Sequence, residues 1–233
     1  MDIDDERIRE AVRHTETLRP PKQSLATFGT TNIYYYLVTE PAYRELVENA
    51  ETVIREGRVV AERPRVVTPY YLSRLEGFSA EARRYLDTVA RQHGVDTPGL
   101  FYSYRNEPKE LTIAADSLLS VVAKLNAEID KRGDPLMSII KGEDELWDVS
   151  LLKFIYDITR SSIEDNLWQL GRRGLLNIDS SGIPADARAR IEELFRRVEA
   201  GQGEPRELKE ELDRWELFPQ YEDRFLALFG RKR

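Results

Sequence analysis

Two patterns of hydrophobic residues follow one another along the chain, and the change comes near residue 115. Before it, β-branched and aromatic residues form short runs such as TTNIYYYLVTE at residues 30–40, and such runs predict strands. After it, apolar residues recur at intervals of three and four, which predicts helices. We therefore expect an α+β fold, with a mostly antiparallel sheet and flanking helices in residues 1–115 and an all-helical region in residues 116–233. The two regions are either separate domains or layers of one domain.

The first region opens with a predicted helix in which Ile8, Val12 and Leu18 lie on one side, and Pro20 stops it. Turn residues then divide the apolar runs into three predicted strand pairs. These span residues 25–39 around Gly29, residues 52–67 with a turn at Glu56 and Gly57, and residues 100–115 with a turn at 106–109. Further helices are expected after Pro41 and in residues 80–94.

In the second region, Asp116 should cap a helix that ends at Gly133, and Pro135 should open another helix through residue 142. The segment at residues 145–160 is apolar on nearly two faces, so we expect a central helix with Leu152 and Ile155 deeply buried. Further helices should start at three prolines, which are Pro184, Pro205 and Pro219.

Composition narrows the possible chemistry. The 233 residues carry a net charge of −7, include two histidines and contain no cysteine. The absence of cysteine excludes disulfides, thiolate metal sites and cysteine nucleophiles. Two histidines provide few side chains for catalysis by a histidine base. The chain has no phosphate-binding glycine loop and no GxSxG motif, so we expect no cofactor. The acidic start lacks a signal-peptide core, and no apolar run approaches the ~20 residues of a membrane span. A cytoplasmic protein without a membrane partner is expected.

Residues 161–184, SSIEDNLWQLGRRGLLNIDSSGIP, combine a polar turn, a short helix and a second turn. This stretch resembles the recognition helix and first wing strand of a winged-helix domain, which implies DNA binding through Arg172 and Arg173. Cations and a glycine at the end of an ordinary helix explain the same residues. Glu164 and Asp165 would repel phosphate from the reading face, so nucleic acid is an unfavoured partner.

A second candidate site is formed by tyrosines and arginines in the predicted strands. Aromatic rings beside guanidinium groups can hold bases or nucleotides on a sheet, although tyrosine is also an ordinary strand residue that packs a core. The candidate binding residues are Tyr34, Tyr36, Arg63, Arg65, Tyr102, Tyr104 and Arg105.

Acidic clusters give a third possibility. Asp144 and Asp148 stand four residues apart, and such a pair can hold a divalent cation for phosphoester chemistry. Acidic residues in the first turn of a helix are also expected from the helix dipole. The acidic series between residues 207 and 213 is interpreted as a solvated helix face.

The sequence therefore favours a soluble, non-enzymatic binding or interaction protein that associates with a protein partner or with itself. The alternatives are a DNA-binding regulator that uses residues 161–184 and a metal-dependent enzyme that uses residues 143–148.

Overall fold

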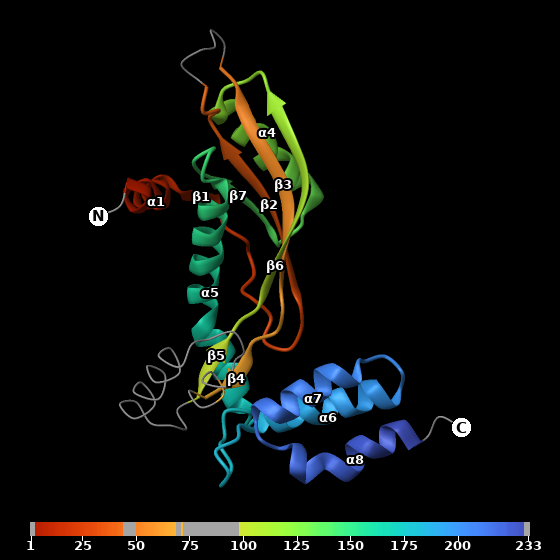
Figure 1. Cartoon of the computed structure of the whole chain (residues 1–233). Helices are drawn as coiled ribbons and strands as arrows, with labels where there is room; N and C mark the ends of the chain where they lie inside the picture. Colours follow the sequence, from red (N-terminus) through yellow and green to blue (C-terminus); the bar gives the residue numbers. More distant parts are fainter. Residues whose placement is uncertain (1–2, 44–49, 69–70, 72–97, 231–233) are drawn as a thin grey trace. The chain divides into compact units, whose positions relative to one another are not determined.

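The computed structural model describes residues 3–43, 50–68, 71 and 98–230 (Figure 1). The chain forms two compact units, each built from two separate segments. Unit 1 comprises residues 1–63 and 102–166, and unit 2 comprises residues 64–101 and 167–233. The boundary predicted near residue 115 does not coincide with the division between these two units. Whether residues 1–115 or residues 116–233 fold as a separate domain stays a prediction.

Unit 1 is organised by a five-stranded mixed sheet with the order β1-β7-β2-β3-β6. The strands are β1 (Glu16–Arg19), β2 (Thr31–Thr39), β3 (Thr52–Ala61), β6 (Tyr104–Ala114) and β7 (Met137–Lys141). Only the pair of β2 and β7 is parallel, and the other three pairs are antiparallel. The predicted α+β fold with a mostly antiparallel sheet is therefore confirmed.

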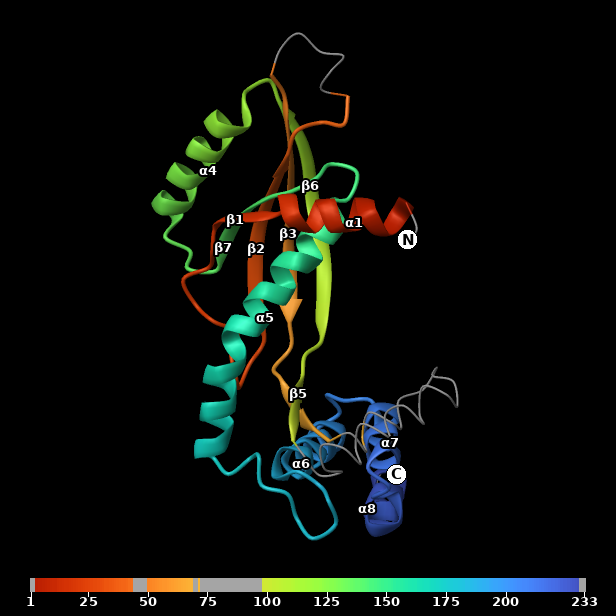
Figure 2. The same cartoon turned by 90° about the vertical axis from the view of Figure 1, so that its left-hand side faces the viewer.

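Helices cover both faces of this sheet, because β2 is apolar on both sides. Ile33, Tyr35 and Leu37 point to the face that packs under α5 (Trp147–Arg172). Tyr36 and Val38 point to the opposite face, under α4 (Leu118–Arg132). Figures 1 and 2 show the two helices on opposite sides of the strands, with α1 (Ile3–His14) beside the start of α5.

The three predicted hairpins are wrong, and two of the three turn signals lie inside long strands. β3 runs through Glu56 and Gly57 without turning. A Cβ atom on Gly57 would lie 2.4 Å from the hydroxyl of Tyr35, so the glycine makes room for a buried ring. Residues 25–29 are not a strand, and β2 pairs with β3 instead of with a preceding hairpin arm.

β6 likewise continues through the predicted turn at residues 106–109. Pro108 pairs with Gly57 and Glu110 pairs with Glu56, so Lys109 is the extra residue of a β-bulge. A bulge shifts the alternation of side chains by one residue. Leu111 and Ile113 consequently point to the α5 face, opposite Arg55 and Val53 of β3.

The second region is not wholly helical, because residues 137–141 form β7 where a helix was predicted after Pro135. Ile139 packs into the core under α4 and Ile140 into the core under α5. A strand between β1 and β2 is buried on both faces, so apolar residues such as Ile139 and Ile140 follow one another directly and do not alternate with polar ones. Such a short run does not distinguish a strand from a buried helix.

The helices of this region otherwise follow the prediction, with local corrections. α4 ends at Gly133 as expected, but its N-cap is Ser117 rather than Asp116. α5 continues without a break through Ser161 and Ser162, where a polar turn was expected. Leu152 is 64% exposed and was wrongly predicted to be buried, whereas Leu151, Phe154, Ile155 and Ile158 face the sheet.

Unit 2 joins the strand pair β4 (Arg65–Val67) and β5 (Gly99–Phe101) to a helical core. Among its described residues, the helical core contains α6 (Ala185–Glu199), α7 (Pro205–Arg214) and α8 (Phe218–Gly230). Pro184 is the N-cap of α6, Pro205 opens α7 and Pro219 is the second residue of α8, so the three predicted helix starts are confirmed.

The helices expected in residues 80–94 and after Pro41 fall wholly or mostly outside the described residues. Leu18 lies in β1 and not at the end of the first helix. In the part of the chain that the structure describes, no helix has the length and hydrophobicity needed to cross a membrane.

Candidate functional site

The outer edge of β6 is the most distinctive surface of unit 1. β6 is the last strand of its sheet and pairs only with β3 among the described residues, so one row of its backbone N–H and C=O groups has no strand beside it. Natural proteins protect such edges with charged residues, prolines and bulges. The half of β6 before Leu111 carries all three, in Arg105, Glu107, Pro108 and the bulge at Lys109.

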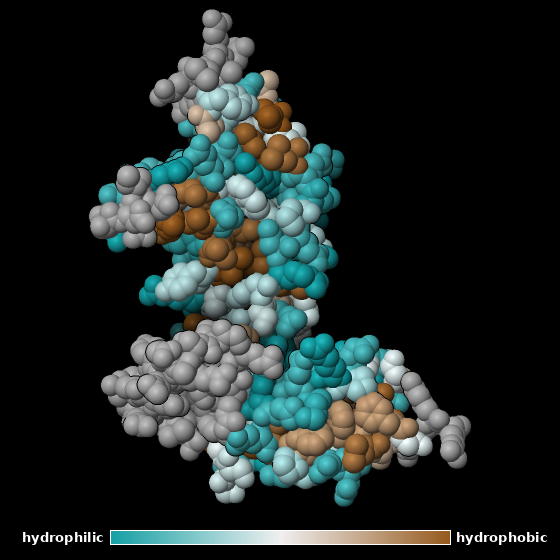
Figure 3. All heavy atoms as spheres, viewed as in Figure 1, coloured by the Kyte–Doolittle hydropathy of each residue, from teal (hydrophilic) through white to brown (hydrophobic). Residues whose placement is uncertain are grey.

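The half of β6 after Glu110 has none of these protections. Its sequence is Leu-Thr-Ile-Ala, and the side chains of Leu111 and Ile113 are 58% and 51% exposed. In Figure 3, hydrophobic atoms gather at the upper end of the sheet, where β6 lies in Figure 1. We call residues 110–114 the open edge. It combines backbone groups that have no second strand beside them among the described residues with two apolar side chains on one face.

Beside the open edge, Arg55 forms an ion pair with Asp144, which the sequence analysis predicted as a metal ligand. The Arg55 guanidinium lies 2.8 Å from the carboxylate of Asp144 and donates to the hydroxyl of Thr39 over 3.1 Å. It also lies over the ring of Trp147, 5.6 Å from its centroid. Burial alone would raise the pKa of Asp144, but hydrogen bonds from Thr39, Arg55 and the backbone of Ala42 outweigh it and lower this pKa.

Asp148, the other predicted metal ligand, is exposed and accepts a hydrogen bond from the backbone N–H of Val149. Within the described residues, no group of three histidine or acidic side chains is arranged to hold a metal ion. The Asp144 contacts are those of a carboxylate that fixes the start of α5 against the sheet.

On the α4 face of the sheet, a groove of about 590 Å³ opens next to the bulge of β6. It contains Tyr34, one of the predicted binding residues, together with three cationic and three acidic side chains. The lining residues are Tyr34, Glu56, Gly57, Arg58, Glu107, Pro108, Lys109, Arg132, Asp134 and Met137.

The charges in this groove already neutralise one another. Arg58 pairs with Glu107, and Lys109 pairs with Glu56. The hydrogen bond from Arg58 lowers the pKa of Glu107, and the same bond raises the pKa of Arg58. An anionic ligand would have to displace these carboxylates, so the groove suits a polar ligand of mixed charge better than a phosphate.

The other predicted aromatic residues are engaged in packing. The rings of Tyr102 and Tyr104 stack with their centroids 6.3 Å apart. The Tyr102 hydroxyl donates to Asn166 of α5, and the Tyr104 hydroxyl shares a hydrogen bond with Thr159 of the same helix. Burial raises the pKa of Tyr102 to about 12. Tyr36 is buried under α4. Of the predicted tyrosines, Tyr34 is the most exposed.

The predicted arginines are dispersed. Arg105 is exposed and pairs with Glu107. Arg63 ends the first segment of unit 1, whereas Arg65 belongs to unit 2. The structure therefore brings together Tyr34 and Tyr36 with Arg58 and Arg132, and not with the arginines that the sequence suggested.

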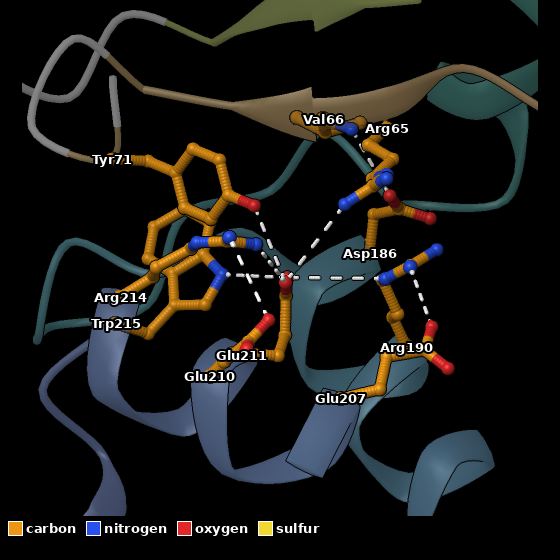
Figure 4. Close-up of polar contacts among 10 residues, drawn as sticks. All are labelled: Arg65, Val66, Tyr71, Asp186, Arg190, Glu207, Glu210, Glu211, Arg214 and Trp215. Atoms are coloured by element: carbon orange, nitrogen blue, oxygen red, sulfur yellow. Dashed lines mark hydrogen bonds and ion pairs between the residues drawn. The ribbon is translucent and has the colours of Figure 1, made fainter. Parts of the chain in front are cut away.

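In unit 2, three arginines surround the buried carboxylate of Glu211 (Figure 4). Glu211 is 4% exposed, although its segment was interpreted as a solvated face. Its oxygens lie 3.8 to 3.9 Å from guanidinium nitrogens of Arg65, Arg190 and Arg214. A burial of this kind is unusual for glutamate unless it is paired.

Two aromatic side chains complete the surroundings of Glu211. The Tyr71 hydroxyl donates over 3.2 Å, and the Trp215 indole N–H donates over 3.3 Å. Burial lowers the pKa of Arg190, and the nearby Arg65 acts in the same direction. The network joins β4, Tyr71, α6 and α7 inside the core of unit 2, which is a structural position.

The segment that resembles a winged-helix reader lies at the end of α5 and the following turns. Arg172 stacks over the ring of Trp168 at 4.8 Å. Gly174 adopts the left-handed conformation after the helix, as expected for a helix stop. The only β pairing from residue 161 to residue 184 is the isolated bridge between Ile178 and Pro184.

Comparison with known proteins gives no match to a protein-family model, to a curated protein or to a solved structure.

Sequence reasoning missed the two most distinctive features. The signal for the open edge was present, because charged residues and a proline stop abruptly before LTIA. Glu211 had no such signal, since it alternates with other charged residues in an ordinary amphipathic pattern.

Proposed function

We propose that this chain is a non-enzymatic interaction protein that binds an extended segment of a protein at the open edge of β6. The observation that carries the proposal is the pair of exposed apolar side chains, Leu111 and Ile113, on an edge strand whose protection ends at Glu110. In strand addition, main-chain hydrogen bonds supply affinity and alternate side chains supply specificity.

The surroundings of the open edge support a binding role in preference to catalysis. Arg55, which lies opposite Leu111 on the same face, and Asp144 neutralise each other in a part-buried ion pair. The ring of Trp147 beside Arg55 extends the apolar character of this face from β6 toward α5. An incoming strand would meet aliphatic side chains and unpaired backbone, which are the elements of β-augmentation.

The test is selection of peptides from a random display library, followed by titration of a selected peptide into the isotope-labelled protein. We expect selected peptides to alternate apolar and polar residues and to shift the backbone amide signals of residues 110–114. Ile113→Lys should abolish binding, because an edge lysine opposes strand addition. The matched control is Leu119→Lys, which replaces an 81% exposed leucine of α4 and should leave binding unchanged.

Peptide signals confined to the groove around Tyr34, or equal loss of binding in both variants, would contradict the proposal. The first result would instead support a ligand site on the α4 face.

A further inference from the structure

We propose that the segment bound at the open edge is the same segment of a second copy of this chain, so that two five-stranded sheets join antiparallel through β6. This inference rests on strand addition as the proposed function. It follows from the register that the sequence of residues 110–114 allows.

A symmetric antiparallel pair of edge strands has its two-fold axis perpendicular to the sheet, so both copies keep the same face on the same side. Residues directly opposite each other share a face. The axis must therefore pass through a residue position, and the open edge offers five choices, from Glu110 to Ala114. Ala114 is the last residue of β6, so an axis there would pair Ile113 with Ala115 and Thr112 with Asp116, both beyond the end of the strand.

The axis at Thr112 gives the complementary register. Leu111 of each copy then faces Ile113 of the other, which covers all four exposed apolar side chains of the two edges on the α5 face. On the α4 face, Thr112 meets Thr112 and Glu110 meets Ala114. Apolar and Thr–Thr pairs across strands are both favourable.

Charge and the bulge exclude the neighbouring registers. An axis at Ile113 would place Leu111 opposite Ala115 and Glu110 opposite Asp116, and both partners lie beyond the end of β6 at Ala114. An axis at Glu110 places two carboxylates opposite each other. Like charges in directly opposite positions are destabilising. An axis at Leu111 places Ile113 opposite Lys109, the bulged residue that breaks the ladder. The sequence thus selects one register out of five.

The expected dimer is weak. A ladder of five residues buries less than the roughly 1,200 Å² of a stable interface, so dissociation constants on the order of micromolar or weaker are expected. The protein should be monomeric when dilute and dimeric at high concentration.

The absence of cysteine from the chain permits a register-specific test. Thr112→Cys would place two thiols at the axis, with Cα atoms about 4.5–5.5 Å apart, a spacing that a disulfide spans. Glu110→Cys places its two thiols four residues apart along the strands, about 13 Å. Leu119→Cys on α4 controls for random collision.

Mild oxidation should cross-link Thr112→Cys at least tenfold faster than Glu110→Cys or Leu119→Cys. Sedimentation equilibrium from about 10 µM to 1 mM should show a monomer–dimer equilibrium in the unmodified protein. Ile113→Lys should weaken it at least tenfold and Leu119→Lys should not. Thermal melts of each variant establish that it is folded.

Equal cross-linking of the three cysteine variants, or a dimer that Ile113→Lys leaves intact, would overturn the inference. A protein that stays monomeric up to 1 mM would also overturn it. If peptides still bind at residues 110–114 in that case, the partner is a different protein and the proposed function stands. If peptides also fail to bind there, both are wrong.

Discussion

At the scale of single residues, the buried Glu211 shows how strongly one carboxylate can organise a core. Three arginines lie around this carboxylate. Among the described contacts, the Nε atom of Arg190 makes no hydrogen bond, so the charge of Arg190 is balanced mainly by the nearby carboxylates of Glu207 and Glu211. Removing one member of a buried ion network leaves the others uncompensated, which costs more than the network contributes in net stability.

Glu211→Gln should therefore lower the free energy of unfolding by about 3–5 kcal/mol while keeping the side-chain volume. The matched control is Glu210→Gln on the same helix, where the carboxylate is partly exposed and pairs with Arg206 and Arg214. Its effect should stay below about 1 kcal/mol. Chemical denaturation measures both, and similar losses in the two variants would refute the structural role of Glu211.

Asp144 gives a prediction with a defined pH dependence. Its pKa is lowered in the folded protein, so the ionised form stabilises the fold above the unfolded pKa of about 3.9. That stability is lost as pH falls through the folded pKa. Asp144→Asn should reduce stability by about 1–3 kcal/mol at neutral pH.

The difference between the unmodified protein and Asp144→Asn should be constant from about pH 5 to pH 8 and should shrink below about pH 4. Asp148→Asn is the control, since this carboxylate bonds only to the first turn of its own helix among the described contacts. Thermal melts across this range provide the measurement. A difference that grows on acidification would reverse the assigned role.

At the scale of secondary-structure elements, α5 shows why apolar composition does not fix orientation. The helix has apolar residues on nearly two faces, and the sheet selects one of them. Phe154 is 1% exposed in the core of unit 1, whereas Leu152 points outward.

Phe154→Ala should destabilise the protein by about 3–5 kcal/mol, because it leaves a cavity under the sheet. Leu152→Ala lies on the same helix and should cost less than about 1 kcal/mol, since little apolar surface is newly exposed. Denaturant midpoints with unchanged slopes give both values. A larger loss for Leu152→Ala would mean that this side of α5 is covered in solution.

At the scale of the whole molecule, charge determines what the protein can bind without specific recognition. Residues 116–233 carry 24 acidic and 19 basic side chains, and Glu164 and Asp165 are exposed near the end of α5. Non-specific affinity for DNA comes mostly from phosphate neutralisation by surplus cations. The stacking of Arg172 on Trp168 already engages one of the two arginines proposed as phosphate ligands.

We expect no measurable binding to duplex DNA at ~150 mM salt. A titration with mixed-sequence and genomic duplexes, monitored by fluorescence anisotropy, tests this expectation. The double variant Arg172→Ala, Arg173→Ala provides the comparison. Micromolar binding that this variant abolishes would support the DNA-binding alternative instead.

The sequence alone determined the features that depend on neighbouring residues. The apolar stripe of α4, its stop at Gly133 and the helix starts at Pro184 and Pro205 were all predicted correctly. Helix periodicity, left-handed glycine and the fixed backbone of proline act within a few residues. A short stretch of sequence therefore contains the information that they need.

Only the tertiary structure decided the features that depend on distant residues. Residues 137–141 are a strand because β1 and β2 lie on either side, and Gly57 is a strand residue because Tyr35 crosses over it. Glu211 is buried because Arg65, Arg190 and Arg214 converge on it. The open edge exists because β6 comes last in the strand order. Strand pairing and buried ion networks join residues far apart in the chain, so no local pattern specifies them.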